Sequence, residues 1–181
     1  MMNKKTIFLV CLVLLVSGCI TTGPSRNTGF TRITDLNELN GIYANLGEGQ
    51  TAARYVYLSE IIWPRADMDH SRIDAIDVRA IDVKTLFIKA LRKGTVIREA
   101  AFVQGRDFEL EGGAIRLLTE LSFVNASRRT GYPAPNYQRI ELGIDKEGHG
   151  KYRESELATG LVWLNGTTGF RDDVKFEKIG K

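Results

Sequence analysis

The sequence predicts a mainly β domain: an antiparallel meander that forms a barrel-like or sandwich structure, with one or two short helices near its N-terminus. Three observations predict this class. From residue 76 onward, apolar and polar residues alternate in short segments, as half-buried strands require. Turns that contain glycine separate most of these segments. Before residue 64, two short segments follow the helical period instead.

The domain is predicted to begin with a single helical turn. Asp35 and Glu38 have the spacing of a capping box, and Leu36 and Leu39 supply the apolar positions of the turn. Residues 41–45 follow as the first predicted strand.

Residues 51–63 form the longest predicted helix. Tyr55, Leu58 and Ile62 recur at the spacing that places side chains on one face of a helix. Pro64 ends the segment, because proline cannot continue a helix.

The remaining predicted elements are strands joined by tight turns. The pair Gly112-Gly113 is a strong hairpin signal, and the segments 92–94 and 145–148 also have turn composition. The predicted strands are residues 76–80, 86–90, 96–103, 107–111, 114–119, 139–144, 157–164 and 174–179.

The N-terminus has the order of features of a bacterial export signal. Lys4 and Lys5 give a short positive region, and the ten residues 7–16 contain no polar side chain other than a cysteine. This run is shorter than the roughly 20 apolar residues that span a bilayer, and it fits the hydrophobic region of a signal peptide. Ser17 and Gly18 then precede Cys19.

This segment resembles the lipobox of bacterial lipoproteins. The resemblance implies removal of a signal peptide at residues 1–18, a diacylglycerol thioether on Cys19, and acylation, for example by palmitate, of the new amino group. Two or three acyl chains hold a protein on a membrane stably. Ile20, rather than aspartate, follows the cysteine. The sorting rule of Gram-negative lipoproteins then implies the outer membrane, with the domain facing the periplasm.

Composition divides the mature chain into two parts. Residues 19–34 are rich in Thr, Gly, Ser and Asn, so we expect the lipidated Cys19 to be followed by a flexible tether. Residues 35–181 are long enough for a single β-rich domain.

Cysteine content and charge exclude several classes of protein. The chain has two cysteines; Cys11 leaves with the signal peptide and the thiol of Cys19 carries lipid, so the mature protein has neither a disulfide nor a free thiol. Removal of Lys4 and Lys5 lowers the formal charge from +3 to +1. This near-balance gives no support to nucleic-acid binding.

The mature part is similar to a group of small, β-rich lipoproteins of Gram-negative bacteria. The similarity consists of the pattern Leu39, Gly41, Tyr43 and Asn45, a short helix that ends at Trp63, a meander, and a final amphipathic strand. It implies no particular activity and no cofactor.

Few residues suggest chemistry. Asp67, Asp69 and His70 lie close enough in the sequence to share a divalent metal ion, although a polar loop explains the same residues. His149 is expected to be a solvated turn residue. Trp63 and Trp163 lie in apolar runs, so we expect both in the core.

The segment 125–137 is the strongest candidate binding loop. It is long for a loop in a small domain, and such loops are often functional. Arginine and tyrosine, which are enriched at binding hot spots, occur in it as Arg128, Arg129, Tyr132 and Tyr137.

These observations favour a membrane-anchored binding or assembly module over an enzyme. Its expected partner is an envelope protein or a small apolar ligand held in the mouth or interior of the β domain. Two alternatives stay open: a hydrolase that acts on the cell wall or another envelope substrate, and an inhibitor or immunity-type protein that uses the segment 125–137.

Overall fold

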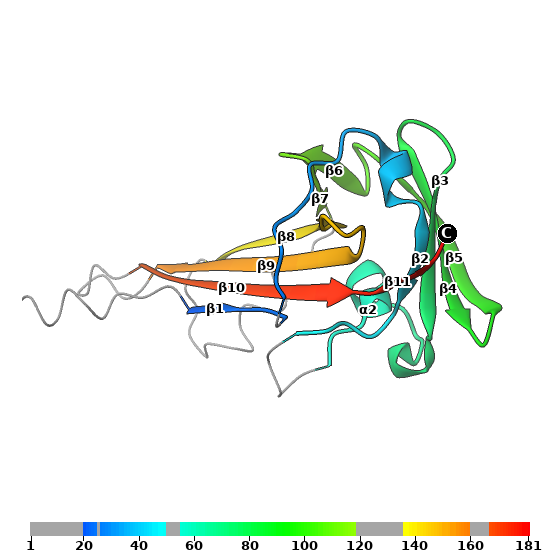
Figure 1. Cartoon of the computed structure of the whole chain (residues 1–181), viewed down its shortest axis with the longest axis horizontal. Coiled ribbons are helices and arrows are strands. Elements are labelled where there is room, and N and C mark those ends of the chain that lie inside the picture. The colour runs from blue at the N-terminus through cyan, green and yellow to red at the C-terminus, as the bar shows by residue number, and fades with distance from the viewer. Residues whose placement is uncertain (1–19, 25, 50–54, 119–135, 160–166) are drawn as a thin grey trace, which may run out of the picture.

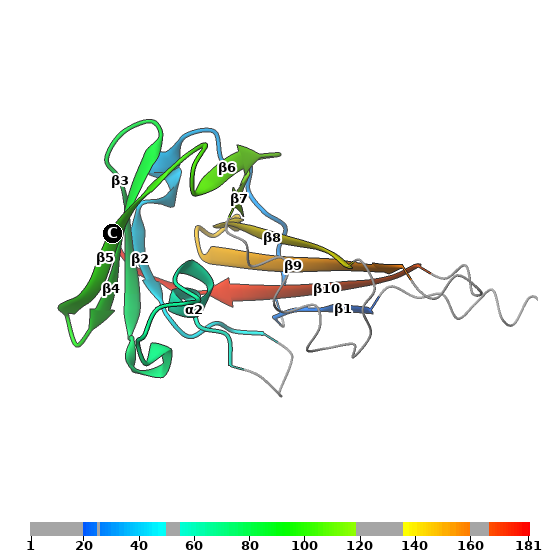
Figure 2. The same ribbon diagram turned by 180° about the vertical axis from the view of Figure 1, so that it is seen from behind.

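A computed structural model describes residues 20–24, 26–49, 55–118, 136–159 and 167–181. The described strands form two sheets that pack face to face, and in Figures 1 and 2 the strands of one sheet run across those of the other. The prediction of a mainly β domain is therefore confirmed. Of the two predicted architectures, the described strands form a sandwich and not a closed barrel.

The first sheet has six strands in the order β1-β10-β9-β8-β7-β6. All neighbours are antiparallel except β1, which is parallel to β10. The strands are β1 (Ile20–Thr22), β6 (Phe108–Glu111), β7 (Ala114–Leu117), β8 (Asn136–Ile144), β9 (Gly150–Thr159) and β10 (Thr167–Phe176).

The second sheet has five antiparallel strands in the order β11-β2-β3-β4-β5. They are β2 (Gly41–Ala44), β3 (Ala75–Ala80), β4 (Thr85–Arg92), β5 (Thr95–Val103) and β11 (Lys178–Gly180). The short helices are η1 (Leu36–Leu39), α2 (Leu58–Ile62) and η2 (His70–Arg72). The chain passes from the first sheet to the second between β10 and β11.

The core lies between the two sheets and is closed by η1 and α2. Ile76 and Phe176 are completely buried, and Phe108 is 1% exposed. Trp63 is also buried, as predicted. Trp163 lies outside the described residues.

The local turn signals are confirmed. Asp35 caps η1 and forms the complete capping box with Glu38. Gly112 and Gly113 both have positive φ in the β6–β7 hairpin, a conformation that side chains other than glycine rarely adopt. The segment 145–148 is also a turn, in which the Gly148 amide donates to the Asp145 carbonyl.

Within the described residues, the helix predicted at residues 51–63 is confirmed at residues 58–62 and wrong at residues 55–57. Residues 51–54 lie outside the described part, and α2 begins only at Leu58, after Tyr57. Tyr57 is extended and forms a bridge with Leu46, so pairing with the segment that follows β2 replaces the first helical turns. The helix ends at Ile62, before Pro64.

Two predicted strand boundaries are also wrong. β9 begins at Gly150 rather than at residue 157, and residues 160–166 lie outside the described part. The strand predicted at residues 174–179 is the end of β10 followed by β11. The break at Glu177 lets one chain segment serve both sheets.

The prediction of a flexible tether is wrong for residues 20–34. β1 pairs with residues 170–172 of β10. Further along, the Thr31 amide donates to the Ile144 carbonyl and the Ile33 amide donates to the Gly113 carbonyl, both at 2.8 Å. Ile33 is 1% exposed. We call residues 20–34 the N-terminal strap, because this segment is bound to the six-stranded sheet.

Candidate binding cavity

A cavity of about 80 Å³ lies between the two sheets. Both sheets and α2 contribute to its wall. Leu58 and Ile62 come from α2, Val78 and Ile88 from the five-stranded sheet, and Ile115 and Leu142 from the six-stranded sheet. These positions face inward because strand side chains alternate between the two faces of a sheet.

The wall of the cavity is almost wholly apolar. Lys151 is the one charged residue among the described residues of the wall, and its ammonium group is bound to the N-terminal strap and to Asp173. Apolar cavities of this kind stay dry and take up apolar molecules. A space of this size suits only a small apolar group, such as a short stretch of alkyl chain.

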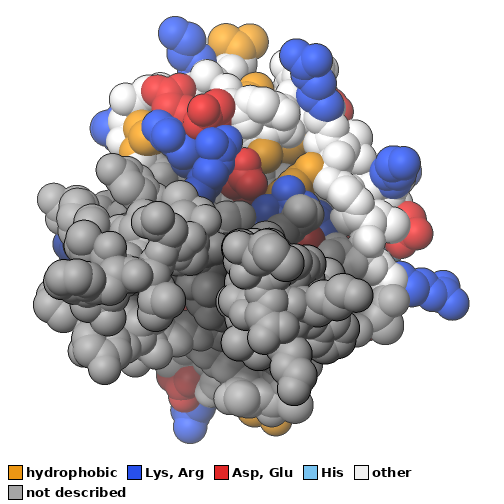
Figure 3. All heavy atoms as spheres, turned by 90° about the vertical axis from the view of Figure 1, so that its left-hand side faces the viewer, with side chains coloured by type: hydrophobic (Ala, Val, Ile, Leu, Met, Phe, Trp, Pro, Cys, Tyr) orange, Lys and Arg blue, Asp and Glu red, His pale blue; other side chains and the backbone are white. Residues whose placement is uncertain are grey.

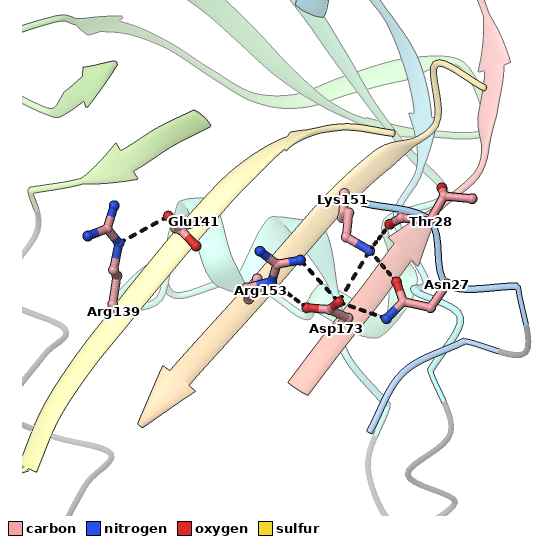
Figure 4. Close-up of polar contacts among 7 residues, drawn as sticks. All are labelled: Asn27, Thr28, Arg139, Glu141, Lys151, Arg153 and Asp173. Carbon is pink, nitrogen blue, oxygen red and sulfur yellow. Dashed lines mark hydrogen bonds and ion pairs between the residues drawn. The ribbon is translucent and has the colours of Figure 1, made fainter. Parts of the chain in front are cut away.

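A buried cluster of charges binds the N-terminal strap to β9 and β10 (Figure 4). The side chains of Lys151 and Asp173 are 3% and 0% exposed. Arg153 Nε lies 2.8 Å from Asp173 Oδ1, and Lys151 Nζ lies 3.4 Å from Asp173 Oδ2. From the strap, the side-chain amide of Asn27 donates to Asp173 at 2.7 Å, and the backbone carbonyl of Thr28 accepts from Lys151 at 2.6 Å.

The surroundings of Asp173 keep it ionised. Burial by itself raises the pKa of this carboxyl group. Hydrogen bonds from Arg153 and Asn27, together with the positive charges of Arg153 and Lys151, outweigh burial and hold the pKa well below its ordinary value. The aromatic ring of Phe30 completes the cluster, with the Arg153 guanidinium carbon 4.6 Å from its centroid. The neighbouring pair Arg139–Glu141 in Figure 4 is more exposed.

This cluster was not predicted from the sequence, because the predicted strand began at residue 157 rather than at Gly150. Lys151 and Arg153 are two residues apart, so they share one face of β9, and Arg153 lies opposite Asp173 in the register of β9 and β10. An earlier start for β9 would have brought these residues together. The contribution of Asn27 and Thr28 has no comparable signal in the sequence.

The structure gives the suggested metal ligands other roles. Asp69 caps η2 and pairs with Arg72. The hydrogen bond from the Ser71 hydroxyl, together with these contacts, lowers the pKa of Asp69. His70 Nδ1 lies 3.0 Å from Ser59 Oγ. Asp67 is exposed. Within the described residues, no group of three acidic, histidine or cysteine side chains is placed to hold a metal ion.

The contact between Ser59 and His70 is the only serine–histidine pair among the hydrogen bonds of the described residues, and it does not form an accessible nucleophile. Ser59 is completely buried in α2. Its amide donates to the side chain of Asn45, which is also completely buried. The pair therefore joins α2 to η2 within the core.

The predicted binding loop falls largely outside the described residues. Arg128, Arg129 and Tyr132 belong to residues 119–135, which the structure does not describe. Tyr137 lies in β8, which begins at Asn136, so the predicted loop extends two residues too far. Contrary to prediction, His149 is more than a solvated turn residue, because its Nδ1 accepts a hydrogen bond from the Lys178 amide at 3.1 Å.

The described part of the surface in Figure 3 carries both signs of charge, with basic and acidic side chains interspersed. Within the described part of this face, neither sign gathers over an extended area. In the described part of the chain, no helix has the length and apolar character needed to cross a bilayer.

Comparison of the chain with protein-family models, with curated proteins and with solved structures found no match in any of the three. Membership of a group of β-rich lipoproteins therefore stays a prediction from the sequence.

Proposed function

We propose that this protein is a lipid-anchored binding module of the cell envelope that holds a small apolar group between its two sheets. The cavity of about 80 Å³ carries this proposal, because its wall offers apolar contacts and almost no polar group that could act on a substrate. The occupant we infer is a short alkyl group of a small molecule or an aliphatic side chain of an envelope protein. The proposed anchor is the lipid on Cys19, at the periplasmic face of the outer membrane.

The anchor is tested by metabolic labelling. We expect the protein to incorporate labelled palmitate in a Gram-negative host and to float with outer-membrane markers, because acyl chains on Cys19 provide its membrane attachment. Cys19→Ser should abolish the label, whereas Cys11→Ser should retain it. Label that persists in the Cys19→Ser variant, or flotation with inner-membrane markers, would contradict the respective part of the proposal.

The cavity is tested by filling it. Val78 lines the cavity, so Val78→Ile adds one methylene group to empty space and should stabilise the protein by up to about 0.8 kcal/mol. The same change should weaken the binding of xenon, an apolar probe, severalfold. Thermal unfolding and xenon-129 NMR measure the two effects.

Val174→Ile is the matched control. Val174 is buried on β10 but does not line the cavity, and it packs against Gly47 and Gly49. The same added methylene should therefore overpack the core and cost about 1–3 kcal/mol. Equal destabilisation by both changes, or equal xenon binding by the Val78→Ile variant and the wild type, would refute the open cavity.

A further inference from the structure

The N-terminal strap determines where on the domain the proposed lipid at Cys19 is attached. Cys19 directly precedes Ile20, the first residue of β1. Ile20 pairs with Phe170 of β10. Because the rest of the strap is bound through Asn27, Thr28 and Ile33, it leaves little free chain between the lipid and the sheet.

The long strands of the six-stranded sheet continue past this attachment point. Thr167, at the start of β10, lies three residues beyond Phe170, which is about 10 Å along the strand. Thr159 of β9 pairs with Thr167 at the same level. Figures 1 and 2 show these strand ends extending beyond β1, with the five-stranded sheet at the opposite end of the molecule.

The ends of β9 and β10 lack charged residues. No Asp, Glu, Lys or Arg occurs in residues 157–159 or 167–170, although 26% of the whole chain is charged. Charged side chains are costly to bring into a bilayer, so a segment without them can approach it at lower cost. The absence of charge thus coincides with the strand ends that reach past the lipid attachment point.

We propose that the ends of β9 and β10, at residues 157–159 and 167–170, contact the surface of the bilayer and hold the domain upright on it. This orientation rests on the proposed lipid anchor at Cys19. The five-stranded sheet then faces away from the membrane.

The orientation also limits the source of the cavity's occupant. Gly150 and Lys151 line the cavity, and Gly150 lies nine residues from Thr159, about 30 Å along β9. A cavity held at that height is out of reach of acyl chains that remain in the bilayer. Its occupant must therefore arrive from the aqueous side.

Fluorescence quenching in vesicles tests the orientation. The lipidated protein is expected to have no free thiol, so one introduced cysteine gives a unique site for an environment-sensitive dye. Thr168→Cys and Ala158→Cys place the dye on paired positions of β10 and β9, and Val83→Cys places it between β3 and β4, where Val83 is 83% exposed. The full-length precursor is processed in the host, and the product is reconstituted in phosphatidylethanolamine–phosphatidylglycerol vesicles that contain nitroxide lipids.

We expect quenching at position 168 and at position 158 to exceed that at position 83 severalfold. Agreement between positions 168 and 158 guards against local distortion by either substitution, and the melting temperature of each variant checks its fold. Mass spectrometry of the same samples measures acylation. Acylated protein with equal quenching at all three positions would overturn the orientation while leaving the anchor intact. Protein without acyl chains would overturn both proposals.

Discussion

Replacing Asp173 with asparagine should lower the free energy of unfolding by about 3–5 kcal/mol, the cost of breaking a buried ion pair by removing one partner. The substitution keeps the size of the side chain but removes the negative charge beside Lys151 and Arg153. Because Lys151 is 3% exposed, water cannot replace that charge easily. The substitution also weakens the hydrogen bond from the Asn27 side chain to residue 173, so the N-terminal strap should detach more readily. Urea unfolding at neutral pH measures the loss.

The pH dependence of stability distinguishes this mechanism from simple mispacking. The pKa of Asp173 is lower in the folded protein than in the unfolded chain. The carboxylate therefore contributes its full stabilisation above its unfolded pKa of about 4, and loses it progressively as the pH falls further. The wild type should lose its advantage over the Asp173→Asn variant across that acidic range. A difference between the two proteins that does not change with pH would refute the electrostatic explanation.

An exposed pair provides the control. Lys175 Nζ lies 2.8 Å from Glu48 Oε2, but the Glu48 side chain is 56% exposed. Glu48→Gln should therefore cost no more than about 1 kcal/mol, as is usual for surface ion pairs. A loss of several kcal/mol at this position would show that burial does not decide the strength of these pairs.

Asn45→Asp should cost at least about 3 kcal/mol at neutral pH. The Asn45 amide group donates to the carbonyls of His70 and Ile73, at 2.8 and 3.0 Å, and its oxygen accepts from the Ser59 amide. An aspartate has the same shape but would place an acceptor against two carbonyl oxygens and bury a charge. Thermal unfolding should therefore show a large loss that shrinks as the pH falls and the new carboxyl group becomes protonated.

Asn37→Asp is the matched change on the surface. Asn37 is exposed on η1, so this change should alter stability by less than about 1 kcal/mol. If the two substitutions have equal effects, Asn45 does not hold α2 and η2 to β2 in the way that its hydrogen bonds indicate.

The pattern Leu39, Gly41, Tyr43 and Asn45 has a structural explanation. The Tyr43 hydroxyl donates to the Leu39 carbonyl at 2.9 Å, and burial raises the pKa of Tyr43 to about 12, so it remains a donor. At Gly41, a Cβ atom would lie 2.3 Å from the Lys178 side chain. These residues stabilise the junction between η1, β2 and β11, and the described contacts assign them no part in chemistry.

Elements with local signals were predictable from the sequence. The capping box at Asp35 and the hairpin at Gly112-Gly113 depend on neighbouring residues, and the structure contains both. The segment around Tyr57 has a helical period, but its pairing with Leu46 depends on a partner that its own sequence does not reveal. The start of β9 was missed because Gly150 and Glu154, which share a face with the buried Tyr152, are not the apolar residues expected on a half-buried strand.

The N-terminal strap and the cavity could not be predicted for a related reason. The strap has the composition of a linker, and its order comes from partners such as Asp173, which lies 146 residues from Asn27. The cavity depends on how side chains from two sheets and α2 pack together. Periodicity indicates which side chains face inward, but it does not give the volume that they leave unfilled.

The long sequence separation between the N-terminal strap and β10 also determines the order of folding. Contacts between distant residues form late, because the entropy of closing the intervening chain must be lost first. A chain synthesised from its N-terminus has no partner for β1 until residues 170–172 of β10 have been made. β1 therefore stays unpaired with β10 through most of synthesis, which would leave the proposed lipidation site at Cys19 accessible to modifying enzymes. Closure of the strap against β10 is then the final step of folding, after which the two ends of the chain hold each other in place.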